Sequence, residues 1–284
     1  KIEKYFNSEI MGTNYMNHFI SQFDEVKWQF LFLMLKAIIK KFIPNIILKY
    51  REKYIIKKNR SYFSKMKDYE IFKEIYLKKL WDPALEKSNH KFYSGPGSHF
   101  PELVDNYINE VKKFLTSLPK KPNVVDLGCG DFSIGSKIRK LCDNYIAVDI
   151  FDKLIYFNKK KYADLNVDFR ILDITCDELP SGDICFVRQV LQHLSNKSII
   201  KFIKAIKNKY KYLIITEHFP PIKNFVANVD KPTGPDIRIY DKSAVILTAP
   251  PFNLKAVKDI DICETAMDSI EGVLNTKLLQ LKDW

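Results

Sequence analysis

The sequence of 284 residues lacks the features that define several common classes of protein. Its five cysteines include no C-x-x-C pair, so a typical zinc site is not expected. Their odd number argues against a secreted fold that is held together by disulfide bonds. The uninterrupted apolar run within residues 26–42 is shorter than the roughly 20 residues that a membrane-spanning helix needs, and it lacks the layout of a cleavable signal peptide. No internal repeat or low-complexity tract is present. We therefore expect a cytoplasmic protein with reduced, mostly buried thiols.

Acidic residues are scarce in one part of the chain. The net charge is +12, and residues 27–92 hold 17 Lys and Arg against 6 Asp and Glu, whereas the rest of the chain is nearly neutral. The chain begins at Lys1 rather than Met, as a piece of a longer protein would. The basic character therefore belongs to the N-terminal part and not to the segments that follow.

Residues 26–60 form a basic, aromatic-rich helical pattern that Pro44 interrupts. Such a helix can lie on an anionic membrane surface, so a location at the inner face of the membrane is one expectation. Packing on the chain's own core or on a second protein is the plainer alternative. Nucleic acid is not expected as a partner, because no recognised nucleic-acid module accompanies the basic patch.

After the helix expected at 101–119, predicted strands alternate with predicted helices. Helices are expected at 68–81, 101–119, 133–142, 152–163 and 196–210, and strands at 123–126, 145–150, 167–174, 183–190, 212–218, 252–262 and 275–282. The glycine-containing segment 92–100 is expected to be a loop that serves either as a connection or as a lid. Strands that alternate with helices predict an α/β fold with a mostly parallel sheet, whose ligands lie at the carboxyl ends of the strands.

The glycine-rich turn after the first strand, Gly128-Cys129-Gly130, is the most informative motif. Glycines let a ligand approach the backbone, and the following helix, with Ser133 as its expected N-cap, offers free N–H groups. The turn does not fit the dinucleotide fingerprint, because Ser133 stands where that pattern needs a third glycine, and no Gly-Lys-Ser/Thr follows as in a P-loop. Asp126, Asp149 and Asp173 are expected to end the first three strands, in register with the turn.

These motifs resemble those of class I S-adenosylmethionine-dependent methyltransferases over most of residues 120–218. Asp126, Gly128 and Gly130 match the first motif, although Phe132 stands where that family often has its third glycine, and VRQVLQHLS at 187–195 resembles the fourth. The resemblance implies a Rossmann-like, seven-stranded, mostly parallel sheet with a reversed last hairpin. It also implies S-adenosylmethionine as cofactor, a methyltransferase domain over 101–284, and a basic helical extension with a lid over 1–100.

The same resemblance supplies candidate cofactor-binding residues. Asp149 matches the acid that binds the ribose hydroxyls, Asp173 matches the acid on the adenine side, and Arg188 is placed to pair with the carboxylate of the donor. The full set is Asp126, Gly128, Cys129, Gly130, Asp149, Ile150, Asp173, Ile174, Arg188 and Gln189, with Tyr93 and Ser98 from the lid. No cluster of His and carboxylates suggests a metal site.

Three residues are candidates for catalysis. His218 at the end of the fifth strand is the leading general base for a hydroxyl acceptor, with Glu217 as its orienter or substitute, and His193 is a weaker candidate that a structural role also explains. Asp230, Asp236 and Arg238, in a long polar segment, are candidates for binding a hydroxyl-rich or anionic acceptor.

The acceptor is the open question. Tyr93 to Ser98 and the segment DKPTGPD at 230–236 resemble segments of methyltransferases of bacterial surface-glycan (capsule or lipopolysaccharide) biosynthesis, which implies methylation of a sugar, nucleotide-sugar or glycan hydroxyl. A small amine or acid as acceptor, and a scaffold that binds the cofactor without turnover, are the alternatives. Methylation of a nucleic-acid base is disfavoured, because Arg188-Gln189-Val190 stands where such enzymes carry Asn/Asp-Pro-Pro-aromatic.

Overall fold

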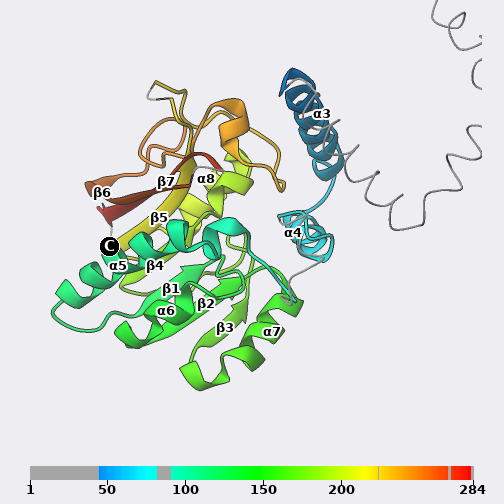
Figure 1. The fold of residues 1–284 in the computed structure, drawn as a ribbon. Coiled ribbons are helices and arrows are strands. Elements are labelled where there is room, and N and C mark those ends of the chain that lie inside the picture. The colour runs from blue at the N-terminus through cyan, green and yellow to red at the C-terminus, as the bar shows by residue number, and fades with distance from the viewer. Residues whose placement is uncertain (1–44, 82–90, 223, 268–269, 283–284) are drawn as a thin grey trace, which may run out of the picture. The chain divides into compact units, whose positions relative to one another are not determined.

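The computed structural model describes residues 45–81, 91–222, 224–267 and 270–282. The chain divides after Lys57 into two compact units, and the second, residues 58–284, holds the sheet (Figure 1). The segment expected to be a helix at 26–42 lies outside the described residues. Among the described residues, no helix is both long and apolar enough to cross a bilayer.

The described part has a seven-stranded sheet with the order β3-β2-β1-β4-β5-β7-β6. Its strands are β1 (Val124–Leu127), β2 (Tyr145–Asp149), β3 (Asp168–Ile171), β4 (Ile184–Arg188), β5 (Tyr212–Phe219), β6 (Ala256–Met267) and β7 (Ile270–Leu281). The first five are parallel, and β7 runs antiparallel between β5 and β6. The predicted fold class is therefore confirmed, including the reversed last hairpin.

The helices and short turns of helix connect these strands. The α-helices are α3 (Asn45–Phe63), α4 (Asp68–Leu77), α5 (Pro101–Ser117), α6 (Gly135–Ile138), α7 (Asp152–Lys161) and α8 (Asn196–Ala205). The 3₁₀ helices are η2 (Pro96–Ser98), η3 (Arg139–Leu141), η4 (Ala163–Leu165), η5 (Leu191–His193) and η6 (Arg238–Asp241). Most elements lie within a few residues of the predicted ranges.

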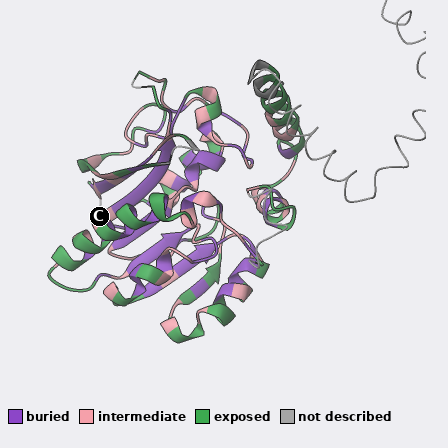
Figure 2. Cartoon of the chain, viewed as in Figure 1, coloured by how far each residue is buried: buried purple, intermediate pink, exposed green. Residues whose placement is uncertain are grey.

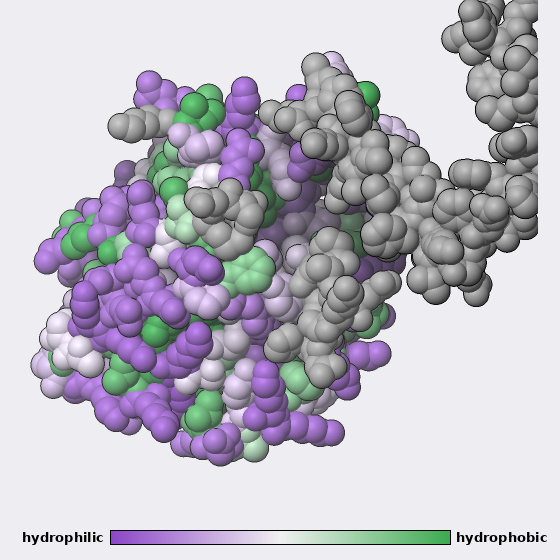
Figure 3. All heavy atoms as spheres, in the orientation of Figure 1, coloured by the Kyte–Doolittle hydropathy of each residue, from purple (hydrophilic) through white to green (hydrophobic). Residues whose placement is uncertain are grey.

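Two hydrophobic cores lie on the two faces of the sheet. On one face, α5 buries Val104, Tyr107 and Val111 against β1 and β4. On the other face, α8 buries Ile199 and Phe202. Figure 2 shows the central strands as a continuous buried layer, which explains why β1 and β4 are apolar runs rather than alternating ones. The outer surface in Figure 3 is mainly hydrophilic over α5 and α7.

Four predicted elements differ from the structure. The expected helix at 133–142 is only the single turn α6 followed by η3, and Ser133 does not cap it. Instead the backbone N–H of Ser133 donates to Asp131 Oδ1 (3.1 Å). Strand β3 ends at Ile171, so Asp173 does not end it, and the last two strands are β6 and β7 rather than 252–262 and 275–282.

Candidate active site

The glycine turn after β1 is held against the neighbouring strand. The N–H groups of Gly128 and Cys129 both donate to Val148 O at 2.8 Å. Gly128 and Gly130 have φ of 80° and 56°, which side chains rarely tolerate. A Cβ at Gly128 would lie 2.4 Å from Val190 Cγ2, and one at Gly130 would lie 2.4 Å from Ser94 Oγ. Glycine is therefore required at both positions by backbone angle and by space.

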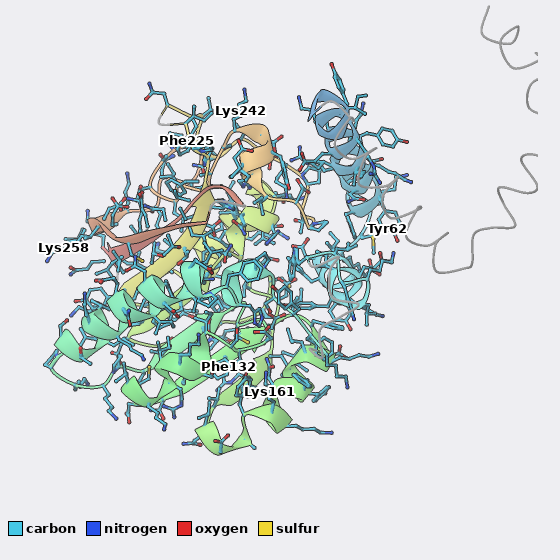
Figure 4. The ribbon with its side chains drawn as sticks, in the orientation of Figure 1. Tyr62, Phe132, Lys161, Phe225, Lys242 and Lys258 are labelled. Atoms are coloured by element: carbon cyan, nitrogen blue, oxygen red, sulfur yellow. The ribbon has the colours of Figure 1, made fainter. Side chains whose placement is uncertain are left out.

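Phe132 occupies the position of the family's third glycine in the left-handed conformation that a glycine would adopt. Its φ is 61°, and its ring is fully buried against Tyr145, Tyr162 and Phe169. Phe132 is labelled in Figure 4. Such a backbone costs of the order of 1–3 kcal/mol, which the burial of the aromatic ring offsets. A Cβ on Gly135 would lie 2.2 Å from the Phe132 ring, so the presence of Phe132 requires glycine at position 135.

Asp126 and Asp149 are both buried acids beside this turn. Tyr145 OH donates to Asp126 Oδ2 (2.9 Å), and burial raises the pKa of Asp126 to about 7. Asp149 accepts hydrogen bonds from the N–H groups of Gly130 and Phe151 at 3.1 and 3.2 Å, and burial raises its pKa to about 6. Each oxygen of Asp149 keeps a second lone pair, so the carboxylate can still accept hydrogen bonds from ribose hydroxyls.

Asp173 lies two residues beyond β3, in a turn that it stabilises. Its Oδ1 accepts hydrogen bonds from Thr175 N and Oγ1 at 2.8 and 2.7 Å, and its own N–H donates to Asp177 Oδ2 (2.7 Å). The side chain of Ile174 is buried in the core shared with α8. Asp173 therefore stabilises a turn in the structure, and its contact with adenine stays a prediction.

The predicted lid is attached to Asp131, in the glycine turn. Ser94 N donates to Asp131 Oδ2 (3.2 Å), Asp131 N donates to Ser94 Oγ (2.8 Å), and His99 Nε2 lies 2.6 Å from Asp131 Oδ2. Burial alone would raise the pKa of Asp131, but the hydrogen bond from His99 holds that pKa below its usual value. Tyr93 stacks on His99 with 4.4 Å between ring centroids, and Ser98 O accepts from Ser133 Oγ (3.2 Å). The segment 92–100 therefore lies directly over the glycine turn.

Helix α4 adds an aromatic residue to this cover. Tyr76 is buried and stacks on Phe151, two residues beyond Asp149, with 5.5 Å between ring centroids. Its hydroxyl lies 3.4 Å from Ser94 Oγ. Phe92 packs edge-on against both rings. Tyr76 and Phe151 were missed by the sequence reasoning, because Tyr76 lies in an ordinary amphipathic helix and Phe151 lies in the short connection between β2 and α7.

Arg188 and Gln189 lie where β4 ends. The Arg188 guanidinium lies 4.7 Å from the centre of the Tyr107 ring, and its Nη2 donates to Leu103 O (3.2 Å). Its Nη1 donates to Gln189 Oε1 (2.8 Å), and its buried Nε has no partner. The Gln189 side chain in turn fills the space beside Gly97, where a Cβ would lie 1.9 Å from Gln189 Oε1. The lid segment therefore also contacts the end of β4.

His218 and Glu217 lie on opposite faces of β5, as successive residues of a strand do. His218 Nε2 lies 2.7 Å from Glu271 O, and Glu217 Oε1 accepts from Leu191 N (3.1 Å). The orienter of His218 in the structure is thus the Glu271 carbonyl rather than Glu217. Burial raises the pKa of Glu217 to about 8, whereas burial lowers the pKa of His218.

The residues 228–241, here called the acceptor-side segment, pack over η5. Asp230 accepts from Asn196 N (2.7 Å), and Asp236 accepts from Arg60 Nη2 (2.7 Å). Arg238 is almost fully buried and donates to the carbonyl oxygens of Val229 and Leu194. In the structure, each of the three predicted acceptor-binding residues therefore already forms hydrogen bonds with other residues of the chain.

His193 is buried beneath the acceptor-side segment. Burial and the charge of Lys231 lower its pKa to about 3, although backbone carbonyls of residues 234–236 oppose the shift. Lys231, which the sequence reasoning missed, is buried and donates to Pro232 O (2.9 Å) and His193 O (3.4 Å). Neutral His193 therefore belongs to a buried polar network.

The model of a family described as "Methyltransferase domain" matches residues 125–211, the stretch from β1 to the start of β5. Residues 125–211 therefore carry the sequence pattern of a methyltransferase domain. The match confirms the predicted cofactor, S-adenosylmethionine. No curated protein matches this sequence. Among the described residues, no group of three or more His, Cys, Asp or Glu is arranged to hold a metal ion.

Solved structures with a similar fold share little sequence with this chain. A magnesium protoporphyrin IX methyltransferase from Synechocystis with bound S-adenosylhomocysteine is 11% identical, with a TM-score of 0.51 over 75% of this chain and 100% of that one. An S-adenosylmethionine-dependent methyltransferase from Leishmania major is 18% identical, with a TM-score of 0.50 over 75% and 86%. At these identities the likeness establishes the fold alone.

Proposed function

We propose that this chain transfers a methyl group from S-adenosylmethionine to a hydroxyl group of a sugar, a nucleotide-sugar or a surface glycan. The match of residues 125–211 to the methyltransferase family model supports S-adenosylmethionine as the donor in this proposal. The geometry of His218 supports the hydroxyl acceptor, and it is the observation that carries the proposal. The resemblance of the segments at 93–98 and 230–236 to those of surface-glycan methyltransferases supports the acceptor class.

The hydrogen bonding of His218 fixes which nitrogen can accept a proton. A carbonyl oxygen only accepts hydrogen bonds, so Nε2 must donate to Glu271 O, and the lone pair of the neutral ring is then on Nδ1. Burial lowers the pKa of His218, which keeps the ring neutral at pH 7. A hydroxyl acceptor loses its proton as it attacks the methyl group, and a neutral imidazole can take that proton.

The residues beside the glycine turn fit the donor. The spare lone pairs of Asp149 suit its ribose hydroxyls, and the unpartnered Nε of Arg188 suits its carboxylate. When bound, the donor supplies an electrophilic methyl group. The lid residues Tyr93 and Ser98 would then exclude water from that site.

Two other functions remain as alternatives. An amine or carboxylate acceptor of a small metabolite would need less help from a base, and a scaffold would bind the donor without turnover. His218 separates these from the leading proposal, because hydroxyl methylation depends most on a base at this position.

The test compares His218→Gln with the unchanged chain in single-turnover assays on sugar, nucleotide-sugar and amine acceptors. For a hydroxyl acceptor we expect the rate of methyl transfer to fall by about 10²–10⁴-fold, while the Kd for S-adenosylhomocysteine stays unchanged. Asp149→Asn is the matched variant for the donor, and it should weaken that Kd about tenfold or more. A His218→Gln variant that stays fully active would exclude the proposed base and favour the amine alternative.

The basic segment 26–60 stays a prediction as a membrane contact. In its described part, α3 exposes Tyr50 and Tyr54, each about 70% accessible, beside the basic residues Arg51 and Lys53. Aromatic and cationic side chains together favour the interface of an anionic membrane. Such a contact would place the chain where surface glycans are assembled.

A further inference from the structure

The lid segment at 92–100 fills space that the glycine turn leaves open. A Cβ on Gly130 would lie 2.4 Å from Ser94 Oγ, so the Ser94 side chain lies directly on the turn. A Cβ on Gly97 would lie 1.9 Å from Gln189 Oε1, so the same segment also packs against the end of β4. The lid segment therefore contacts two of the places that hold predicted donor-binding residues.

The predicted donor-binding groups beneath the lid segment are shielded from solvent. Asp149, which matches the ribose-binding acid, is only 7% exposed, and Gly130 is buried. Tyr76 of α4 covers the same region, because its hydroxyl lies 3.4 Å from Ser94 Oγ and would lie 3.7 Å from a Cβ on Gly130. A molecule the size of S-adenosylmethionine cannot reach the turn past these side chains. The lid segment must therefore move when the donor enters or leaves.

A buried carboxylate in the turn holds the lid segment in place. Asp131 is 3% exposed, and His99 Nε2 lies 2.6 Å from its Oδ2. Although burial alone would raise the pKa of Asp131, the hydrogen bond from His99 holds that pKa below its usual value, so the side chain is a carboxylate at pH 7. A carboxylate only accepts hydrogen bonds, so His99 Nε2 donates. The bond is therefore charge-assisted, which makes it stronger than a bond between neutral groups.

Two groups of the lid segment bond the Asp131 carboxylate. The backbone N–H of Ser94 donates to Oδ2 (3.2 Å), and His99 Nε2 makes the shorter bond to the same oxygen. Tyr93 stacks on His99 with 4.4 Å between ring centroids, which holds the imidazole in the orientation that this bond needs. Asp131 N in turn donates to Ser94 Oγ (2.8 Å). The His99 side chain is therefore the part of this contact that a substitution can remove without deleting a backbone donor.

We propose that His99 is a positioning residue for the methyl donor: its hydrogen bond to Asp131 holds the lid segment over the glycine turn and must break before the donor enters or leaves. This inference rests on the proposed donor site at the glycine turn. In this role His99 bonds the turn and not the donor, so the bond has the same strength whether or not the donor is bound. Loss of the bond should therefore favour opening equally in the free and the donor-bound chain.

The experiment measures the association and dissociation rates of S-adenosylhomocysteine by stopped-flow fluorescence for the full chain and for two variants of His99. His99→Phe keeps an aromatic ring to stack on Tyr93 but removes the hydrogen bond, whereas His99→Gln keeps an amide donor. For His99→Phe we expect both rates to rise about tenfold, while the Kd stays within about threefold. For His99→Gln we expect both rates to stay within about threefold of those of the unchanged chain. Lys113→Gln, at an exposed ion pair of α5, is the control and should change neither rate.

The two rates together separate this role from a purely structural one. A residue that only presses the lid segment onto the bound donor would raise the dissociation rate alone when it is removed, so that result would overturn the proposal. Unchanged rates in His99→Phe would overturn it as well. A general loss of folding would lower the fraction of chains that bind and would not raise the association rate.

Amide hydrogen exchange tests the hydrogen bond without the donor. In the unchanged chain the N–H groups of Ser94 and Asp131, which bond across the contact, should exchange with equal protection through one opening, and faster than the Gly128 N–H, which donates to β2. In His99→Phe both should exchange about tenfold faster, with Gly128 unchanged. Unequal protection of the two amides in the unchanged chain would overturn the proposal. If S-adenosylhomocysteine does not bind the unchanged chain, the proposed donor site fails, and the exchange data still decide whether His99 holds the lid segment closed.

Discussion

The buried carboxyl of Glu217 should make the folded state less stable as the pH rises, and Glu217→Gln should remove that loss. Burial raises the pKa of Glu217 from 4.5 to about 8, and Arg238 only partly opposes it. Between these two pH values the folded chain keeps a proton that the unfolded chain releases. The free energy of unfolding therefore falls with rising pH across this window, and Glu217 contributes stability only at the acidic end.

The size of the effect follows from the width of the window. The window spans about 3.5 pH units, and each unit corresponds to about 1.4 kcal/mol. The ionisation of Glu217 should therefore lower the free energy of unfolding by roughly 4–5 kcal/mol between pH 4.5 and pH 8. Asp126 and Asp149, with pKa values raised to about 7 and about 6, add slopes of the same sign. The difference between the unchanged chain and Glu217→Gln isolates Glu217.

The assay is urea unfolding at pH 5, 6, 7 and 8, followed by circular dichroism. Glu217→Gln cannot ionise, so its stability should fall less steeply than that of the unchanged chain. Lys231, whose pKa burial lowers to about 8, affects both proteins equally, mainly above that pH. Parallel stability curves from pH 5 to 8 would refute the idea that Glu217 is protonated in the folded chain.

Three further predictions concern other parts of the chain. Gly130→Ala should weaken the Kd for S-adenosylhomocysteine at least tenfold by calorimetry, because its φ of 56° and the 2.4 Å approach to Ser94 Oγ leave no room for a Cβ; an unchanged Kd would contradict this geometry. Arg60→Gln should lower the free energy of unfolding by about 2 kcal/mol, because it leaves buried Asp236 short of a partner, whereas Lys78→Gln at an exposed ion pair should change it by less than about 1 kcal/mol. The full chain should sediment with anionic but not neutral lipid vesicles, and a Tyr50→Ser, Tyr54→Ser double variant should weaken this binding; equal binding to neutral vesicles would argue against the membrane prediction.

The positions of most strands along the chain and the main motif were predictable from the sequence, because both depend on local patterns. Apolar runs with flanking turns located β1 and β4, and Gly128 and Gly130 located the turn that follows β1. The lid was predictable as a segment, since 92–100 combines glycines and serines. The attachment of this segment to Asp131 through His99 was not predictable, because that contact joins residues 32 positions apart in the sequence.

Other misses have equally physical causes. Ser133 has the sequence of a helix cap, but the left-handed Phe132 before it redirects the chain, so Asp131 takes the Ser133 N–H instead. The last hairpin was placed imprecisely because β6 is an edge strand with exposed side chains on much of its length, which weakens the alternating pattern. Lys231 was overlooked because lysine is rarely buried, and only the tertiary contact with Asp236 explains its position.

The contact between Phe132 and Gly135 has a consequence for how this loop can vary among related proteins. A large ring at position 132 leaves no space for a side chain at position 135, whereas glycine at position 132 would free that space. Positions 132 and 135 should therefore change together during evolution, so that a large side chain at one accompanies glycine at the other. A protein that acquired a side chain at position 135 while it still had Phe132 would have an overpacked core. Replacement of Phe132 by glycine is therefore the expected first step.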